Sequence, residues 1–280
     1  MDTPRKDWKG SRLSMTREDG VAVIHLFNPP HGFMDETMES ELLEALDKLG
    51  TWRDGRVVVI TGGEPDMFVR HYDVSILQHR SQAMIERGKT FSIERSVPKS
   101  VIHQCIERID NSPLIFIAAL NGTAMGGGFE LALGCDIRLA QDGVYQLGLP
   151  ELNLGLLPGA GGTQAMASLI GTGPALFSLL TAKVFTPQEL LAVGLVSMCT
   201  DDVMADAMKL ARQIQAVPSR ACANIKKLVR NAPRWSQEQG LAAERTLFCD
   251  CMVDPEAQPL MEAVASGNRT IADQPVLLKR

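Results

Sequence analysis

The chain has 280 residues, of which 45% are hydrophobic and 22% are charged, and this composition is typical of a globular protein. Its formal net charge of −5, with basic residues scattered along the sequence, argues against nucleic-acid binding, which needs clustered Lys and Arg. No apolar run approaches the roughly 20 residues that cross a bilayer, so we expect no membrane span.

The N-terminal residues and the cysteines predict a cytoplasmic protein without a metal site. Asp2, Asp7 and Glu18 interrupt the first stretch, and no apolar segment typical of a signal peptide follows. Six irregularly spaced cysteines predict reduced, mostly buried thiols rather than a disulfide scaffold. The close pair, Cys249 and Cys251, is separated by a single residue, which matches no usual zinc spacing.

Strand and helix patterns alternate through the first half of the chain. Apolar or β-branched runs predict strands at residues 21–27, 57–60, 113–120 and 136–140. Helical spacing of apolar residues predicts helices at residues 35–49 and 129–133. An alternation of this kind indicates an α/β fold.

From about residue 165 onward the patterns are mostly helical. Thr186 is expected to cap a helix with Pro187 at its first position, and Pro218 and Pro233 mark later breaks. The last 60 or so residues show helical patterns and no convincing strand. We therefore expect a core at residues 1–210 and a helical extension at residues 211–280.

The most informative stretch is Gly-Thr-Ala-Met-Gly-Gly-Gly-Phe-Glu, at residues 122–130, directly after the predicted strand 113–120. Glycines at a strand end let the backbone bend sharply and present bare N–H groups to a ligand. The helix that follows would aim the positive end of its dipole at the same place. These features indicate a pocket that stabilises negative charge, with Glu130 inside it as a proton carrier.

Two nucleotide-binding motifs and a packing turn are alternatives for these glycines. No Gly-Lys-Ser/Thr ending follows them, and residues 159–164 lack the last glycine of a dinucleotide fingerprint. Close packing of the turn at residues 126–128 against a neighbouring element stays open.

Two glutamates lie among apolar residues. Glu130 is flanked by Phe129 and Leu131, where an unpartnered buried carboxylate is costly; alternatively, it faces solvent and interacts with the helix dipole. Glu151 lies in the apolar segment 147–158. Two carboxylates in apolar surroundings fit paired acid–base catalysis.

Three segments, in this order, resemble the enoyl-CoA hydratase (crotonase) superfamily. They are Asn121–Asp136, Pro150–Glu151 and Leu157–Gln164, and the similarity extends from residues 21–28 to residues 192–196. The resemblance implies a spiral of ββα units with a helical C-terminal region that completes neighbouring sites. It also implies a homotrimer or a dimer of trimers.

The same resemblance implies an acyl-CoA substrate and roles for individual residues. In that family two backbone N–H groups form an oxyanion hole for the thioester carbonyl, and the matching positions here are Tyr72 and Gly127. The hydratase members use two glutamates, which match Glu130 and Glu151. Residues expected to contact the acyl-CoA are Gly32, Arg70, His71, Tyr72, Gly126 and Gly127. Coenzyme A belongs to the substrate, so no separate cofactor is implied.

The segment Phe68–Asp73 departs from the family pattern, which has small residues and a glycine before the aspartate. His71 occupies the glycine position, where a positive φ would be strained, so either the loop conformation differs or the site is reshaped. Arg70 and His71 could contact CoA phosphates or a polar acyl group, or could be solvated loop residues. Lys226 and its neighbour at position 227 are read as surface lysines, with a CoA phosphate as the alternative partner.

Hydration of a 2-enoyl-CoA is the leading hypothesis. Negative charge develops on the carbonyl oxygen, while one carboxylate takes a proton from water and the other supplies one at the α-carbon. Isomerisation, C–C cleavage or thioester hydrolysis on the same fold stays an alternative, as does a non-catalytic relative that binds CoA esters or RNA. The acidic balance argues against RNA, and two retained carboxylates argue against an inactive protein.

Overall fold

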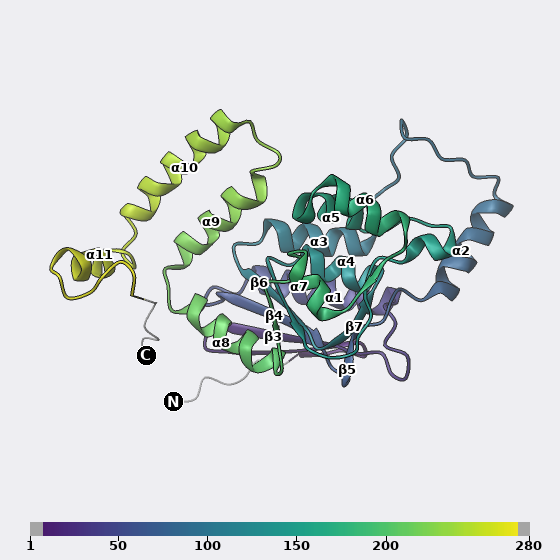
Figure 1. Cartoon of the computed structure of the whole chain (residues 1–280), viewed down its shortest axis with the longest axis horizontal. Coiled ribbons are helices and arrows are strands. Elements are labelled where there is room, and N and C mark those ends of the chain that lie inside the picture. Colours follow the sequence, from purple (N-terminus) through teal and green to yellow (C-terminus); the bar gives the residue numbers. More distant parts are fainter. Residues whose placement is uncertain (1–7, 274–280) are drawn as a thin grey trace.

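The structure, a computed structural model, describes residues 8–273 and is built around a seven-stranded sheet (Figure 1). In spatial order its strands are β1 (Trp8–Lys9), β2 (Leu13–Glu18), β3 (Val21–Leu26), β4 (Val57–Gly62), β6 (Ile115–Leu120), β8 (Ile137–Gln141) and β11 (Met198–Thr200). The first three strands are antiparallel, and β3, β4, β6, β8 and β11 run parallel. Central strands β4 and β6 are buried along their whole length, which explains their continuous apolar sequences.

A second, four-stranded sheet contains shorter strands. Its order is β10 (Val184–Phe185), β9 (Leu147–Gly148), β7 (Gly122–Met125) and β5 (Asp66–Val69). Each consecutive pair, β4–β5, β6–β7 and β8–β9, places one strand in each sheet, and helices follow each pair. Those helices are α2 (Val74–Glu86) and α3 (Val101–Asn111), then α4 (Gly127–Gly134), then the short 3-10 helix η1 (Glu151–Leu154), α5 (Gly162–Ile170) and α6 (Thr172–Leu180). The predicted α/β spiral of ββα units is confirmed.

Helices cover both faces of the large sheet. Because successive residues of a strand point to opposite faces, Phe116 packs with α1 (Glu36–Gly50), α3 and α4, whereas Ile117 packs with Val203 and Ala207 of α8 (Val203–Gln215). Strands and helices predicted from the sequence lie where expected. Helix α7 (Pro187–Ala192) begins with the predicted Thr186 cap and Pro187.

The C-terminal helices α9 (Ser219–Asn231), α10 (Gln237–Met252) and α11 (Gln258–Ala265) extend away from the body of the molecule (Figure 1). The predicted domain boundary at residue 210 falls inside α8, which still packs on the sheet. A trimer-forming role for this region stays a prediction, and residues 1–7 and 274–280 of the two predicted domains lie outside the described residues.

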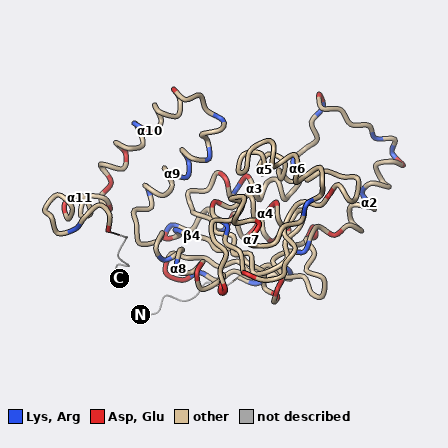
Figure 2. The backbone as a smooth tube through the Cα atoms, viewed as in Figure 1, with Lys and Arg blue, Asp and Glu red and all other residues tan. Residues whose placement is uncertain are grey.

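The structure bears on three expectations from the sequence: the distribution of charge, membrane spans and the state of the cysteines. Basic and acidic residues are interspersed along the chain (Figure 2). No helix within residues 8–273 is both long and apolar enough to cross a membrane. All six cysteines are free, but only Cys105 and Cys135 are buried, so the prediction of mostly buried thiols is wrong. The other four lie on helices or strands whose packing is only partial.

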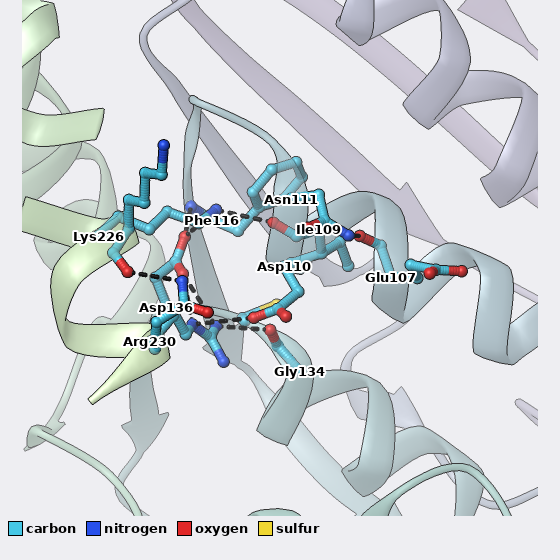
Figure 3. A network of polar contacts seen from close by, with 12 residues as sticks. Glu107, Ile109, Asp110, Asn111, Phe116, Gly134, Asp136, Lys226 and Arg230 are labelled. Atoms are coloured by element: carbon cyan, nitrogen blue, oxygen red, sulfur yellow. Dashed lines mark hydrogen bonds and ion pairs between the residues drawn. The ribbon is translucent and has the colours of Figure 1, made fainter. Parts of the chain in front are cut away.

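Lys226 is buried, which contradicts its reading as a surface lysine (Figure 3). Its ammonium group lies 2.8 Å from the Asp136 carboxylate and donates hydrogen bonds to the carbonyls of Ile109 and Leu114. Arg230, one turn further along α9, donates to the other Asp136 oxygen at 2.8 Å. These contacts attach α9 to the end of α3, to the residue before β6 and to the turn between α4 and β8.

Candidate active site

Tyr72 lies between β5 and α2, in the segment that departs from the family pattern. The Met34 N–H donates to the His71 carbonyl and the Asp73 N–H to the Met34 carbonyl, both at 2.9 Å. Tyr72 sits between these two bonds, so its own N–H points to the other side of the segment. This N–H has no hydrogen-bond acceptor among the described residues.

His71 does not adopt the positive φ that the family's glycine at this position suggested. Within residues 8–273 the non-glycine residues with positive φ are Asp19, Asp66 and Ala182. Two backbone hydrogen bonds of Arg70 hold the loop instead. The Arg70 N–H donates to the Gly32 carbonyl, and the Met125 N–H donates to the Arg70 carbonyl. Of the two alternatives, a different loop conformation or a reshaped site, the first applies, because residue 71 is not in the left-handed region.

Gly127 lines the same cavity as Tyr72 and has a second backbone N–H. It is the first residue of α4, after a turn in which Gly126 adopts a φ of 50°, and N–H groups of a first helical turn have no acceptor within the helix. A methyl group on Gly127 would lie 3.7 Å from the Tyr72 Cβ. The packing alternative applies at Gly128, where an added Cβ would lie 2.4 Å from the Val69 carbonyl oxygen.

Glu130 is buried in the first turn of α4 and has only 4% of its surface exposed, so the solvent-facing alternative is wrong. Its Oε1 atom accepts hydrogen bonds from the N–H groups of Ala160, at 2.7 Å, and Gly162, at 2.8 Å. Burial raises the pKa of Glu130, and these backbone donors oppose that shift. The glycine-rich loop at residues 157–164 therefore cradles a carboxylate rather than a nucleotide.

Glu151 begins the short helix η1 and faces the same space. Its Oε1 lies 3.2 Å from where a Cβ on Gly126 would be, which favours glycine there. Its Oε2 atom is buried and has no hydrogen-bond partner. Burial, with a smaller contribution from the nearby Glu130 charge, raises the pKa of Glu151 to about 7. Near neutral pH this carboxyl group can either donate or accept a proton.

One cavity of ≈ 490 Å³ joins these groups. This volume suits a small-molecule ligand. Its polar lining includes Glu130, Glu151 and the backbone at Tyr72 and Gly127, and its apolar lining comes from Leu77, Leu154, Leu156 and Leu157. The cavity can therefore hold an apolar chain beside two carboxylates and two free N–H groups.

The residues predicted to contact acyl-CoA separate into two groups. His71, Tyr72, Gly126 and Gly127 line the cavity. Gly32 is buried and Arg70 is exposed, and both lie outside the cavity lining. The position of Arg70 agrees with its reading as a solvated loop residue, and CoA contacts of these residues stay predictions.

Two charged residues of the cavity were not identified from the sequence. Glu39 of α1 has 4% of its surface exposed, and burial, opposed in part by Arg80 of α2, raises the pKa of Glu39 to about 7. A signal existed, because Glu39 precedes Leu42 and Leu46 by three and seven residues on the apolar face of its helix. Across residues 8–273, no group of three His, Cys, Asp or Glu side chains could hold a metal ion.

Comparison with known proteins agrees with this geometry. Residues 16–265 match the family model described as enoyl-CoA hydratase/isomerase. A probable enoyl-CoA hydratase from Bacillus subtilis is 31% identical over 259 residues, which cover 90% of this chain and 94% of the relative. A fatty acid oxidation complex subunit alpha from Shewanella baltica is 32% identical over 262 residues, but the match covers only 33% of that longer protein.

Solved structures share the fold. An enoyl-CoA hydratase from Geobacillus kaustophilus superimposes with a TM-score of 0.83 at 28% identity, over 94% of this chain and 97% of that one. DspI from Pseudomonas aeruginosa superimposes with a TM-score of 0.80 at 27% identity, over 95% and 97% of the two chains.

Proposed function

We propose that this chain, which belongs to the enoyl-CoA hydratase/isomerase family, adds water across the double bond of a 2-enoyl-CoA thioester. One observation carries the proposal. Glu151, whose Oε2 has no partner, lines the same cavity as the backbone-held Glu130 and the free N–H groups of Tyr72 and Gly127. Hydration needs two proton-transfer groups and a site for a developing oxyanion, and this cavity offers all of them.

The two backbone N–H groups bind the thioester carbonyl oxygen. Attack of water on the β-carbon moves electrons from the double bond onto this oxygen, which makes an enolate-like state. Preorganised donors stabilise that charge, and the loss of one such donor typically costs about 10²–10³-fold in rate. The positive end of α4 adds to the effect at Gly127.

We assign the base role to Glu130 and the acid role to Glu151. Hydrogen bonds from Ala160 and Gly162 oppose the rise that burial causes in the pKa of Glu130, whereas Glu151 Oε2 has no such donor. Of the two, Glu130 is therefore the group we assign to take a proton from water as the oxygen bonds to the β-carbon. Glu151, with its pKa near 7, gives its proton to the α-carbon as the enolate collapses. Proton exchange with solvent returns both glutamates to their starting states, and the product is a 3-hydroxyacyl-CoA.

The experiment mixes the purified protein with 2-butenoyl-CoA and 2-hexenoyl-CoA and follows the loss of enoyl-thioester absorbance. We expect products heavier by one water. Glu130→Gln and Glu151→Gln should each lower kcat by about 10²–10⁴-fold, because each removes one proton-transfer group. Glu44→Gln, an exposed position on α1, is the matched control and should keep the wild-type rate.

Other outcomes assign a different reaction. A product of unchanged mass indicates isomerisation, and release of free CoA thiol indicates thioester hydrolysis. A folded protein that consumes none of these esters contradicts the proposal.

We also propose that the chain forms a homotrimer or a dimer of trimers in the cytoplasm. Exposed apolar side chains on the projecting helices support the assembly; they include Ile225, Val229, Phe248 and Val253. Six free cysteines are typical of a reducing compartment. Light scattering on the purified protein tests the assembly, and a monomer would contradict it.

A further inference from the structure

A second set of polar groups lies in the cavity, apart from the two glutamates assigned to acid–base catalysis. It consists of the Glu39 carboxylate from α1, the Tyr72 hydroxyl group and the Arg80 guanidinium from α2. The hydration mechanism uses the backbone of Tyr72 but not its side chain, and it uses neither Glu39 nor Arg80. We refer to Glu39 and the Tyr72 hydroxyl below as the acyl-end pair.

The acyl-end pair keeps hydrogen-bonding capacity that the protein does not use. The Tyr72 hydroxyl oxygen is buried and makes no hydrogen bond of normal geometry, although the Arg80 guanidinium lies near enough to interact with it electrostatically. Glu39 is buried, and its carboxylate interacts electrostatically with Arg80, although no hydrogen bond or ion pair joins that carboxylate to another residue within 8–273. Buried polar groups in proteins are normally satisfied, and an unsatisfied one lowers stability. The unsatisfied Tyr72 hydroxyl group and the Glu39 carboxylate line the same cavity and interact electrostatically, which indicates a ligand that hydrogen-bonds to both.

Arg80 is already engaged. Its guanidinium forms an ion pair with Glu36 on the outer side of α1 and lies 5.6 Å from the centre of the Tyr72 ring. It therefore holds the ring in place from one side. A carboxylate ligand would have to compete with Glu36 for this cation while facing the charge of Glu39, so the wall does not suit an anionic acyl group.

We propose that the acyl-end pair binds a hydroxyl group carried by the acyl chain of the substrate. A hydroxyl group can donate to the Glu39 carboxylate and accept from the Tyr72 hydroxyl at the same time, whereas a plain hydrocarbon chain leaves both unpaired. This inference rests on the proposed function, because the Tyr72 N–H on the same residue would bind the thioester oxygen.

The protonation of Tyr72 agrees with a donor role. Burial, with a contribution from the Glu39 charge, raises the pKa of Tyr72 to about 12, so the phenol keeps its proton throughout the physiological range. Because Tyr72 donates and the Glu39 carboxylate accepts, the bound hydroxyl group takes one orientation, with its hydrogen directed toward Glu39.

The test compares 2-hexenoyl-CoA with its 4-, 5- and 6-hydroxy derivatives, because the isomers scan the chain for the bound position. We expect at least one hydroxy ester to show a kcat/KM about 10- to 100-fold above that of 2-hexenoyl-CoA, the range for hydrogen bonds that involve a charged group. Equal or lower values for all three isomers would overturn the inference. So would a preference for the acyl chain that ends in a carboxylate, 2-hexenedioyl-CoA.

Variants test the residues themselves. Tyr72→Phe and Glu39→Gln should each reduce the hydroxyl preference about tenfold, whatever their effect on the rate with 2-hexenoyl-CoA. Glu44→Gln, the same substitution on the exposed side of α1, should keep the preference. A preference that survives both cavity variants contradicts the assignment to this pair.

A binding measurement separates this inference from the proposed function. If the wild-type protein hydrates none of these esters, hydration is rejected, and calorimetry with hexanoyl-CoA and its hydroxy derivatives then answers the second question. We expect about tenfold tighter binding of one hydroxy ester, lost in Tyr72→Phe and Glu39→Gln. Equal affinities in the wild-type protein would overturn the inference regardless of catalysis or of variant folding.

Discussion

The attachment of α9 to the core and the candidate active site both bury charged groups, but they do so in opposite ways. At the attachment, Asp136 contacts Lys226 and Arg230, and Lys226 also meets two carbonyl groups (Figure 3). In the cavity, three carboxylates line one space, and Glu151 leaves one oxygen without a partner.

The two regions differ in how far an oppositely charged partner opposes the effect of burial on the pKa of each group. Burial lowers the pKa of Lys226, and the Asp136 charge opposes that shift, so the ammonium group is buried against an oppositely charged partner. For Glu39 and Glu151 burial is the largest influence, and it raises the pKa of each to about 7. Paired charges hold elements together, whereas unpaired carboxylates stay able to exchange protons near neutral pH.

The largest expected effect is on stability, at the ion pair between Lys226 and Asp136. Lys226→Met should lower the free energy of unfolding by about 3–5 kcal/mol, because it leaves a buried carboxylate with one partner fewer. Lys227→Met is the matched control, since the neighbouring lysine is exposed, and it should change stability by less than about 0.5 kcal/mol. Urea unfolding measures both, and equal effects of the two substitutions would break the comparison.

A similar effect, on activity rather than stability, is expected at Gly127. Proline is tolerated at the first position of a helix but has no N–H, so Gly127→Pro should lower kcat/KM about 10²–10³-fold in a folded protein. Gly127→Ala keeps the donor, and its methyl group would meet Met34 at 3.4 Å and Tyr72 at 3.7 Å, which are ordinary contacts. It should remain within about tenfold of the wild type. If alanine and proline are equally damaging, the N–H group is not the functional feature.

The smallest expected effect is a gain in stability at the unpaired carboxylate. Between pH 4.5 and about 7 the unfolded chain releases the Glu151 proton while the folded protein keeps it, so folding becomes less favourable as the pH rises through this window. Glu151→Gln removes this penalty and should raise the free energy of unfolding by about 1–3 kcal/mol at pH 8.

The same variant should match the wild type at pH 4, where both states are protonated. Thermal unfolding at the two pH values measures the change, and Glu44→Gln controls for the loss of a glutamate as such. An equal gain at both pH values would show that burial of the carboxylate is not its cause.

Much of the fold could be predicted from the sequence because its central strands are buried on both faces. Continuous apolar runs such as Val57–Gly62 and Ile115–Leu120 leave a strong local pattern. Strands β9 and β10 have only two residues each, too few for any periodicity, so the second sheet could not be predicted.

Site residues could likewise be predicted where a local sequence pattern marks them, and not where only the tertiary structure brings them together. Glu130 and Glu151 were identified because carboxylates in apolar segments are conspicuous, and the fold brings both to one cavity. Lys226 was misread because its partner, Asp136, lies far away in the sequence and only the tertiary structure joins them. Glu39 carried a readable signal on the apolar face of α1, but the role we propose for it depends on Tyr72 and Arg80, which come from other parts of the chain.

The cavity keeps the Glu151 carboxyl group ready to exchange a proton near neutral pH, and a ¹³C NMR titration can measure this property on the residue itself. Glutamate Cδ atoms are labelled in the wild-type protein and in Glu151→Gln, and the signal missing from the variant is assigned to Glu151. We expect this signal to titrate with a midpoint at about pH 7. A midpoint near 4.5, the ordinary value for a glutamate, would contradict it.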